Sequence, residues 1–540
     1  MGEPALPLIK PTKKGLPKSR SKMVLLDHDA NELIFAIVGP VGSGTSEVAR
    51  TLQELLENPS LPGGKYDTQI LKAREEITAW AKKKKLQLPS KPVDDLDTAF
   101  ALQELGDKMR ESDPSAVATA LAIAIRRTRA KKLNIPLGAD PIIPNGARRA
   151  YILDSIRHPA EVHLLRNLYK SSFNLIGVVC EEERRRERIK KKYSNAGDKL
   201  AEEFMKRDAK GTEKHGQRVF EAFHLSDFFV DNSVERFLPG KKSNKHWKIN
   251  EVLNRLIKVI THMDVCRPTV SETAMYQANG AAMRSACLSR QVGAALIDKN
   301  GNLVSTGTNE VPKAGGGVYG DGFEEGSNLK DERCAYWTQG EQYCSNTREQ
   351  NEIIEDLIDK VPELKAVMDQ QKRDALKLSL RNTRIGGLLE FSRAVHAEMD
   401  ALVSAGRQGT STIGSRMFVT TFPCHYCARH IVSAGIDEVQ YIEPFPKSQA
   451  LKLHWDSIVV ESSGWKAPSD GGSAVLFHPF TGVAPRLYAR AFLKDRDLKD
   501  DERGTKRIGD ADWGSPWHLK RVSYVELESE LANLESADGF

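Results

Sequence analysis

The 540-residue sequence lacks any apolar run approaching the ~20 residues that a membrane-spanning helix needs. Its first residues lack the apolar core of a signal peptide, so a cytoplasmic protein without membrane partners is expected. Cysteine is scarce, and seven residues, an odd number, favour reduced thiols over a disulfide framework. The sequence also lacks a strong excess of either charge, because it has 79 basic and 73 acidic residues. The net charge of +6 permits an anionic partner without requiring one.

A chain of this length exceeds what a single hydrophobic core can organise, so more than one domain is expected. Residues 1–30 have the composition of a basic, flexible arm, for which a nucleic-acid contact is the alternative interpretation. Residues 31–262 alternate apolar strands with helices, which predicts an α/β domain built on a parallel sheet. A second α/β pattern occupies residues 263–495, with an insertion at about 311–385, and residues 496–540 form a charged tail.

The first half holds four short apolar runs that predict strands. They are separated by stretches with helical periodicity, including a charged stretch at 71–80. The first run leads into a glycine-rich turn and then an amphipathic helix, which is the order of elements in a phosphate-binding loop. The four runs lie at 33–38, 150–156, 173–180 and 227–232.

The turn GPVGSGTS (39–46) fits the pattern G-x-x-x-x-G-K-[ST] except at one position, because Thr45 replaces the lysine. Its glycines permit a tight backbone that directs N–H groups at phosphates, and a serine hydroxyl follows that can reach Mg²⁺. A nucleoside triphosphate with Mg²⁺ is therefore the candidate ligand. The candidate residues are Gly39, Gly42, Ser43, Gly44, Thr45 and Ser46, with Asp154 in a Walker-B-like place.

The missing lysine leaves three roles open for this half. An active kinase would need an arginine or lysine from the basic run at 182–192 to neutralise the phosphates. A domain that senses nucleotide and regulates the second half needs no phosphoryl transfer, and the substitution favours this role. A structural remnant is the third alternative.

The second half contains a possible metal ligand in RAVHAEMDAL (393–402), where His396 and Glu398 lie two positions apart in a helical pattern. A histidine in a helix is usually a surface or core residue, so a metal site requires further ligands elsewhere. Periodicity places Val395, Met399 and Leu402 on the buried face of this helix.

The further ligands follow 28 positions after His396, in PCHYC. Cys424 and Cys427 share one helix face at i and i+3, near a helix start where the dipole favours thiolates. A lone C-x-x-C is often a structural zinc site or a pair of reduced thiols. One histidine and two cysteines, however, leave the fourth position of a tetrahedral zinc open for water, as catalytic sites require. His425, Tyr426 and His430 are interpreted as non-ligands.

Glu398 has a role that the ligands cannot fill. Zinc lowers the pKa of bound water from ~15.7 to about 7, and a carboxylate two residues beyond a ligand can take and pass on its proton. The order H-x-E followed by P-C-x-x-C is the signature of zinc deaminases. The sequence therefore predicts His396, Cys424 and Cys427 as zinc ligands and Glu398 as the catalytic proton carrier.

The runs around these motifs resemble the deoxycytidylate deaminases, notably at 284–312, 396–402 and 420–448. The segment HPFTGVAPRLY (478–488) and the first half are similar to the two-domain bacterial deoxycytidine nucleotide deaminases of antiphage defence, which carry an N-terminal P-loop kinase-like domain. The resemblance covers essentially the whole chain. The zinc motifs alone fit every cytidine-type deaminase, so it is the flanking runs that select this branch.

The resemblance implies a C-terminal cytidine-deaminase-like α/β/α domain, with a five-stranded sheet and zinc between two helices. It also implies hydrolysis of free dCMP or dCTP, with depletion of dCTP during phage infection. Asn309 matches the family's deoxyribose contact, although an amide between glycine and proline positions is also a turn former. A homo-oligomer, such as a hexamer, and a small inhibitory RNA are suggested in the same way.

Other candidate residues rest on chemistry alone. Lys447 and Ser448 offer a cation and a hydroxyl suited to a phosphate, with a solvated loop as the alternative. Cys334 and Cys344 in the insertion are interpreted as structural thiols, because no histidine lies near them to complete a second zinc site.

Three functions remain open from the sequence. The favoured one is a deaminase of free deoxycytidine nucleotides that the P-loop half controls. The second is a deaminase that edits cytosine in nucleic acid. The third is a nucleotide kinase regulated by a deaminase-like domain.

Overall fold

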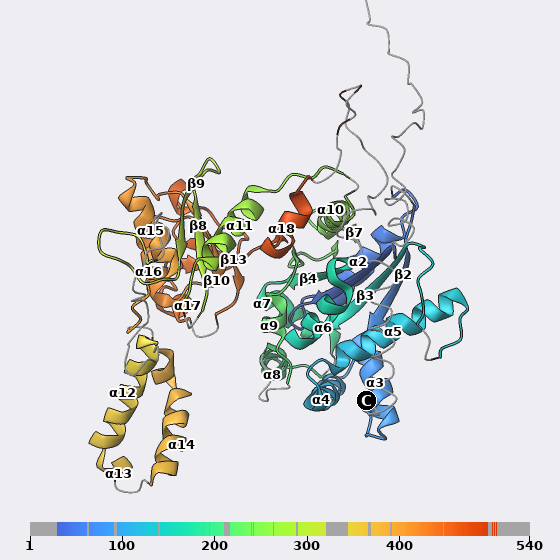
Figure 1. Ribbon diagram of the computed structural model, residues 1–540, viewed down its shortest axis with the longest axis horizontal. Coiled ribbons are helices and arrows are strands. Elements are labelled where there is room, and N and C mark those ends of the chain that lie inside the picture. Colours follow the sequence, from blue (N-terminus) through green and yellow to red (C-terminus); the bar gives the residue numbers. More distant parts are fainter. Residues whose placement is uncertain are drawn as a thin grey trace, which may run out of the picture.

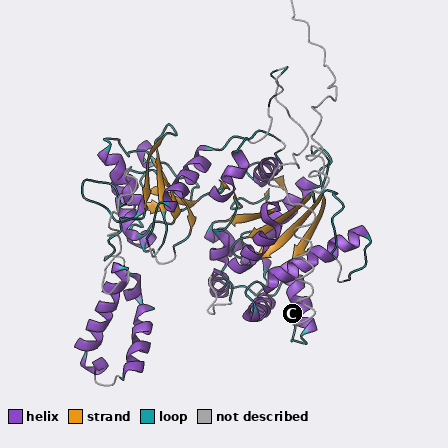
Figure 2. Cartoon of the chain, viewed as in Figure 1, coloured by secondary structure: helices purple, strands orange, loops and turns teal. Residues whose placement is uncertain are grey.

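The computed structural model shows two α/β units, each built around a six-stranded sheet, and a helical hairpin that extends from the second unit (Figure 1, Figure 2). It describes residues 30–494 without 62–63, 91–93, 139–140, 194, 210–215, 239, 241, 263, 288–289, 320–343, 366–368, 389–390 and 446–447, and also residues 499, 502 and 504. Almost all of the predicted basic arm and charged tail lies outside these residues. Among the helices described, none is both long and apolar enough to cross a membrane.

The first sheet has β1 (Glu32–Val38) at its centre, parallel to β3 (Arg149–Ile156) on one side and β4 (Phe173–Val179) on the other. β2 (Asp67–Lys72) extends the sheet beyond β3, and β5 (Phe228–Asp231) extends it beyond β4, both in parallel. The chain thus builds strands on both sides of β1, and the loop after β1 lies at the switch point where such sheets bind ligands.

The helices of the first unit cover both faces of its sheet (Figure 1). Leu52 of α2 and Leu253 of α10 share one buried cluster, whereas Ile77 of α3 and Leu165 of α6 share the other. Their bounds are α2 (Thr45–Leu56), α3 (Ala73–Lys83), α4 (Leu96–Ser112), α5 (Ala116–Leu133), α6 (Pro159–Tyr169), α7 (Glu182–Lys192), α8 (Asp198–Ala209), α9 (Val219–Phe223) and α10 (Ile249–Thr261), with the short η1 (Lys170–Ser172), β6 (Phe237–Leu238) and β7 (Lys242–Ser243).

The four strands predicted for the first half are confirmed as β1, β3, β4 and β5. β2 is absent from the prediction, because an edge strand with only partial burial carries no continuous apolar run. The charged stretch predicted as helix at 71–80 is therefore wrong at its start, since Leu71 and Lys72 belong to β2 and α3 begins at Ala73.

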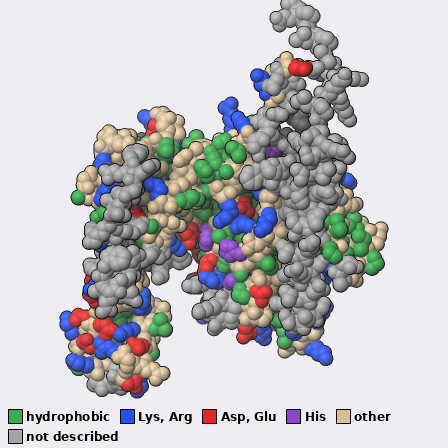
Figure 3. All heavy atoms as spheres, viewed as in Figure 1, with side chains coloured by type: hydrophobic (Ala, Val, Ile, Leu, Met, Phe, Trp, Pro, Cys, Tyr) green, Lys and Arg blue, Asp and Glu red, His purple; other side chains and the backbone are tan. Residues whose placement is uncertain are grey.

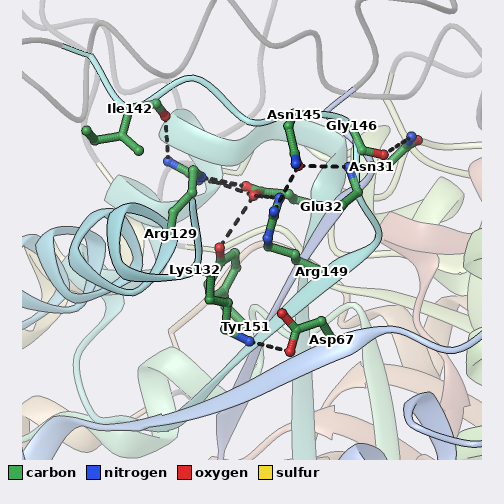
Figure 4. A network of polar contacts seen from close by, with 11 residues as sticks. Asn31, Glu32, Asp67, Arg129, Lys132, Ile142, Asn145, Gly146, Arg149 and Tyr151 are labelled. Atoms are coloured by element: carbon green, nitrogen blue, oxygen red, sulfur yellow. Dashed lines mark hydrogen bonds and ion pairs between the residues drawn. The ribbon is translucent and has the colours of Figure 1, made fainter. Parts of the chain in front are cut away.

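A buried ion pair fastens α5 to β1 at the amino edge of this sheet (Figure 4). Arg129 Nη2 donates to Glu32 Oε2 at 2.6 Å, and both side chains are at most 1% exposed. Tyr151 donates from its hydroxyl to Glu32 Oε1 at 3.4 Å, and Arg149 Nη1 lies 3.5 Å from the same oxygen. Removing one partner of such a pair typically costs about 3–5 kcal/mol, because it leaves a buried charge unpaired.

The second sheet is mixed, with the strand order β12-β13-β11-β10-β8-β9. β8 pairs antiparallel with both β9 and β10, whereas β11, β13 and β12 continue from β10 in parallel. The sheet has six strands where the resemblance implied five, because the two-residue β12 joins its edge. The bounds are β8 (Gly293–Ile297), β9 (Leu303–Thr308), β10 (Arg416–Thr421), β11 (Glu438–Glu443), β12 (Ile458–Val459) and β13 (Val475–Pro479).

Helices cover both faces of the second sheet, as the predicted α/β/α layering requires. α11 (Val270–Met283) packs on the face that carries Ala295 and Phe418. α15 (Ala397–Arg407) and α16 (His425–Ser433) pack on the opposite face. A Cβ at Gly307 would lie 2.0 Å from the carbonyl oxygen of Ala397, so this glycine is what allows α15 to approach β9 so closely.

One segment of the second half returns to the first sheet. β14 (Gly482–Val483) follows β13 and pairs antiparallel with β5. α18 (Pro485–Phe492) packs against α10 and α11 (Figure 1). Phe480 contacts Phe229 of β5, with ring centroids 6.2 Å apart. The sequence assigns 263–495 to the second domain, but this pairing adds residues 482–492 to the core of the first unit, where they cover the edge of β5.

The predicted insertion contains a helical hairpin. Charged side chains of both signs cover it (Figure 3), and ion pairs such as Arg373–Glu355 and Lys360–Asp356 link them. Cys334 lies outside the described residues, and Cys344 is the N-cap residue of α12. The elements of this region and the remaining short helices are α12 (Ser345–Lys360), α13 (Pro362–Lys365), α14 (Gln370–Arg381), η3 (Arg384–Gly387), α17 (Ala450–Leu453) and η4 (Pro468–Asp470).

Candidate active site

His396 and Glu398 lie at the start of α15, not within a longer helix as the sequence pattern indicates. His396 is the N-cap residue and the helix begins at Ala397. The preceding residues are held outside the helix, since Val395 forms a bridge to Glu310 instead. Of the three residues that periodicity places on the buried face, Val395, Met399 and Leu402, only Leu402 is buried.

Cys424 and Cys427 approach His396 from the start of the neighbouring helix. Cys424 is the N-cap residue of α16, and its Sγ accepts the backbone N–H of Cys427 at 3.5 Å. Nδ1 of His396 lies 3.3 Å from Sγ of Cys424 and 3.4 Å from Sγ of Cys427. The structure thus brings together the three predicted ligands, whose donor atoms all lie within 4.8 Å of one another.

This donor set fits zinc. An imidazole nitrogen and two sulfurs are ligand types that zinc prefers, and three protein ligands leave one position open. Within the described ranges, these are the residues that form a cluster able to hold an ion, and His425, Tyr426 and His430 are not part of it.

The surroundings of the cluster favour a thiolate at Cys424. Hydrogen bonding from Cys427 and His396 lowers the pKa of Cys424 to about 4. α15 and α16 both begin at the cluster, and the positive ends of their helix dipoles also favour a thiolate. The pKa of Cys427 is raised, because its thiol donates to Cys424 and is buried.

Glu398 is a buried carboxyl group in the first turn of α15, with 4% of its surface exposed. Burial raises its pKa to about 7, and the negative charge of Cys424 acts in the same direction. A carboxyl group whose pKa lies near neutrality is suited both to accept a proton and to donate one.

His396, Glu398 and Cys424 line a cavity of about 420 Å³. Asn309 lines it as well, at the end of β9. Its Nδ2 donates to the carbonyl oxygen of Arg290 at 2.8 Å, and its backbone N–H donates to Val292. The amide is therefore held in place at the cavity wall, which is consistent with the predicted substrate contact.

The insertion supplies a wall of this cavity that the sequence interpretation does not foresee. Asn346 and Gln350 of α12, Arg381 of α14 and residues 386–388 line the cavity, and Arg290 lines it from the sheet side. No motif marks these residues, because the chain brings them to the cavity through tertiary packing. The sequence therefore carried no signal that could have found them.

The two predicted phosphate contacts differ in what the structure shows. Lys447 lies outside the described residues. Ser448 donates from its hydroxyl to the carbonyl oxygen of Pro423 at 2.8 Å and accepts the N–H of Ala450. This hydroxyl thus supports the turn that precedes Cys424, and Ser448 is not among the residues that line the cavity.

The predicted phosphate loop occupies the carboxyl end of β1. Gly42 and Gly44 adopt φ of 82° and 85°, values that favour glycine, and α2 begins at Thr45. Ser46 Oγ donates to Asp154 Oδ2 at 2.6 Å, so the residues predicted to reach Mg²⁺ lie side by side. Gly39 and Ser43 complete the turn, and the hydroxyl of Ser43 is buried close to Gly39.

Comparison with known proteins defines the class of the second unit. Residues 268–443 match the family described as "Cytidine and deoxycytidylate deaminase zinc-binding region", a segment that includes Glu398 and all three candidate ligands. Together with the relatives below, this match identifies the chain as a hydrolytic deaminase.

Two of the curated relatives are phage deoxycytidylate deaminases. That of enterobacteria phage T4 is 28% identical over 179 residues, which are 33% of this chain and 78% of the phage protein. That of phage T2 is 29% identical over 181 residues, 33% of this chain and 80% of the phage protein. The dCMP deaminase of cyanophage S-TIM5, solved with dCMP and dUMP, is 19% identical and covers 40% of this chain and 99% of its own, with a TM-score of 0.22.

Proposed function

We propose that the chain deaminates free deoxycytidine nucleotides, dCMP and dCTP, at C4 of the base and releases ammonia. The observation that carries the proposal is a buried carboxyl group beside a His-Cys-Cys cluster, both opening onto one cavity of about 420 Å³. The phage deoxycytidylate deaminases support dCMP as a substrate, and dCTP extends the same chemistry.

Zinc held by His396, Cys424 and Cys427 would supply Lewis-acid activation of water near neutral pH. Glu398 takes one proton from the water that attacks C4 and delivers it to N3 of the cytosine ring. It then carries the second proton to the amino group, which leaves as ammonia while the C4 carbonyl forms. Burial suits Glu398 to both steps, because it brings the pKa of the carboxyl group close to neutrality.

The remainder of the nucleotide is assigned to the other cavity walls. Asn309 contacts the deoxyribose, since its amide is fixed at the end of β9 by Arg290 and Val292. Arg381 provides positive charge for the phosphate, and Arg290, whose Nη2 also pairs with Glu443 at 2.8 Å, lies on the same wall. Lys447 and Ser448 stay predictions from the sequence, since Lys447 lies outside the described residues and Ser448 does not line the cavity.

A free nucleotide is favoured over a polymer because the cavity has an extra wall from the insertion and few exposed aromatic groups. Phe422 packs inward against Tyr441 and Phe477, with centroids 4.8 and 5.7 Å away. Phe422 is 9% exposed, and Phe445 is the other phenylalanine that lines the cavity, so the aromatic surface on which an extruded base could stack is small.

The substrate test offers the purified protein dCMP, dCTP, deoxycytidine, cytosine-containing single-stranded DNA and adenosine-containing RNA, and measures ammonia. Deamination of the DNA is expected to be at least about 100-fold slower than that of dCMP or dCTP, a barrier about 2.7 kcal/mol higher, since a base in a strand must bring both neighbouring nucleotides to a cavity that the insertion walls on one side. Uracil appearing in the oligonucleotide as fast as in dCTP would overturn the proposal.

We further propose that the first unit binds a nucleoside triphosphate with Mg²⁺ and controls the deaminase, which would deplete dCTP in antiphage defence. This control is supported by the loop geometry at Gly42 and Gly44 and by the Ser46–Asp154 contact. The second half of the chain also adds β14 to the first sheet, so the two units share structure through which binding could act.

Gly44→Val is expected to weaken the binding of nucleotide by the first unit at least tenfold, about 1.4 kcal/mol, because side chains strain this conformation. A Cβ at Gly44 would also lie 2.3 Å from Nδ2 of Asn232. Ser46→Ala should weaken Mg²⁺-dependent binding through loss of its hydroxyl. Nucleotide titration by calorimetry, together with deaminase assays at fixed dCMP, measures both effects.

The matched control is Gly64→Val, at a glycine with φ of 94° and no atom within 4 Å of an added Cβ. It carries the same backbone strain away from the loop. Unchanged nucleotide binding and unchanged deaminase response in both Gly44→Val and Ser46→Ala would show that the loop is a structural remnant.

A further inference from the structure

A second cavity, of about 670 Å³, lies at the carboxyl edge of the first sheet. The loop 39–46 lines one part of it, and residues of α3, α4, α7 and the segment at Gln217 line the rest. Its volume lies within the ~300–1,000 Å³ typical of small-molecule sites. One ligand in this cavity can therefore contact the loop and the helices together.

A buried pair of carboxamides lines this cavity. Gln103 of α4 is 8% exposed and Gln217 is 6% exposed. Gln103 Nε2 donates to Gln217 Oε1 at 3.2 Å, whereas no described residue hydrogen-bonds to Gln103 Oε1. A buried acceptor left without a donor costs about 1–3 kcal/mol, which a ligand that donates to it would recover. Paired amides offer an acceptor beside a donor, the pattern that the edge of a nucleobase complements.

A cation from α7 stands beside the loop that lacks its lysine. Arg188 Nη1 donates to the carbonyl oxygens of Ser43 at 3.5 Å and Asn232 at 2.8 Å. A Cβ added to Gly44 would lie 3.6 Å from the same nitrogen. Nε of Arg188 is paired with Glu235, but Nη2 is buried and has no hydrogen-bond partner in the described part of the chain.

The charge of the cavity favours an anion. Two of its arginines are already compensated, because Arg110 pairs with Glu161 at 2.7 Å and Arg157 pairs with Asp208 at 2.6 Å. The remaining basic residues that line the cavity outnumber the remaining acidic ones. The basic residues are Arg50, Lys72, Arg74, Arg188 and Lys192, and the acidic residues are Glu47, Asp154 and Glu235.

We propose that this cavity binds one nucleoside triphosphate, with Arg188 replacing the missing lysine at the phosphates and with Gln103 and Gln217 reading the base. The inference rests on the nucleotide binding proposed for the first unit, and it assigns residues to the triphosphate and to the base of that nucleotide. Ser46 and Asp154, 2.6 Å apart, mark the Mg²⁺ end. The amide pair specifies a base edge that places an N–H donor opposite Gln103 Oε1.

The test titrates the full-length, zinc-loaded chain with Mg²⁺ and each of ATP, dATP, dCTP, dGTP and dTTP, and separately with inorganic triphosphate, in a calorimeter. Gln103→Met, which keeps the side-chain size, is expected to weaken the tightest of the five nucleotides about tenfold and to leave inorganic triphosphate unchanged. Arg188→Ala is expected to weaken both probes about 10- to 100-fold, and Arg188→Lys to recover part of the loss.

Two control variants change residues of the same types outside the cavity. Arg184→Ala lies on α7 and Gln53→Met lies on α2, and neither residue lines the cavity, so both variants should bind every probe as the parent does. Zinc content and thermal unfolding verify that each variant is folded.

Three results would overturn all or part of the inference, and they can be told apart. If the parent binds a nucleotide but Gln103→Met binds it equally well, the base assignment fails while nucleotide binding by the first unit stands. If Arg188→Ala binds inorganic triphosphate as the parent does, the assignment of Arg188 to the phosphates fails while nucleotide binding by the first unit stands. If the parent binds none of the six probes, the proposed nucleotide control fails together with the inference.

Discussion

Glu398→Gln is expected to bind zinc and to fold as the parent does, yet to lose at least about 10²–10⁴-fold in turnover on dCMP. Glutamine keeps the size of the buried side chain but cannot take a proton from water or return one to the base. The loss should exceed that of a group handling a single proton, since two transfers depend on this carboxyl group. Metal analysis and ammonia release measure the two properties separately.

Asp400→Asn is the matched control for this experiment. Asp400 lies on the same helix and is also buried, but its Oδ2 accepts the backbone N–H of Thr308 at 3.0 Å and the residue does not line the cavity. This variant should lose stability while most turnover remains. If Glu398→Gln with full zinc turned over dCMP at near the parental rate, Glu398 would have no part in proton transfer.

Cys424→Ala is expected to lose zinc, and with it all measurable deamination. Two ligands, His396 and Cys427, cannot replace the three donors that the folded chain holds within 4.8 Å. The second unit should also become easier to unfold, since a ligand present at 1,000 times its Kd contributes about 4 kcal/mol to the folded state. Metal content of the purified variant and its denaturation with and without added zinc measure both effects.

Cys266→Ala controls for the loss of a thiol as such. Cys266 lies in the segment between the two units and is not part of the ligand cluster. It should leave the zinc content at one ion per chain. A full complement of zinc in Cys424→Ala would show that the metal is held elsewhere.

Long periodic elements and local motifs could be predicted from the sequence. β1, β3, β4 and β5 carry buried apolar runs, and such runs identify strands without knowledge of their partners. β2 escaped prediction because its residues are only partly buried, so its sequence resembles that of the charged helix that follows it. The pairing of β14 with β5 could not be predicted, because two residues carry no periodicity and their partner lies some 250 positions earlier in the sequence.

The residues of the catalytic cluster could be predicted from the sequence for a different reason. His396, Glu398, Cys424 and Cys427 occupy the first turns of two helices, so short spacings in the sequence translate directly into distances in space. The cavity walls lack this property, since Arg381 and Gln350 reach the site from a hairpin whose fold no motif encodes. Likewise, Thr45 showed that a lysine was missing, but only tertiary structure brings Arg188 to the loop from α7.

Because residues 482–492 pack on the first unit, that unit is assembled from two parts of the chain, and the second part follows the second unit in the sequence. β5 is synthesised some 250 residues before the strand that covers its edge, so the first sheet is complete only after residues 482–483 have been synthesised. Until then, Phe229 has neither Phe480 nor β14 beside it. A fragment that stops at the end of the first α/β pattern therefore contains a sheet whose β5 edge is open to pairing with other chains.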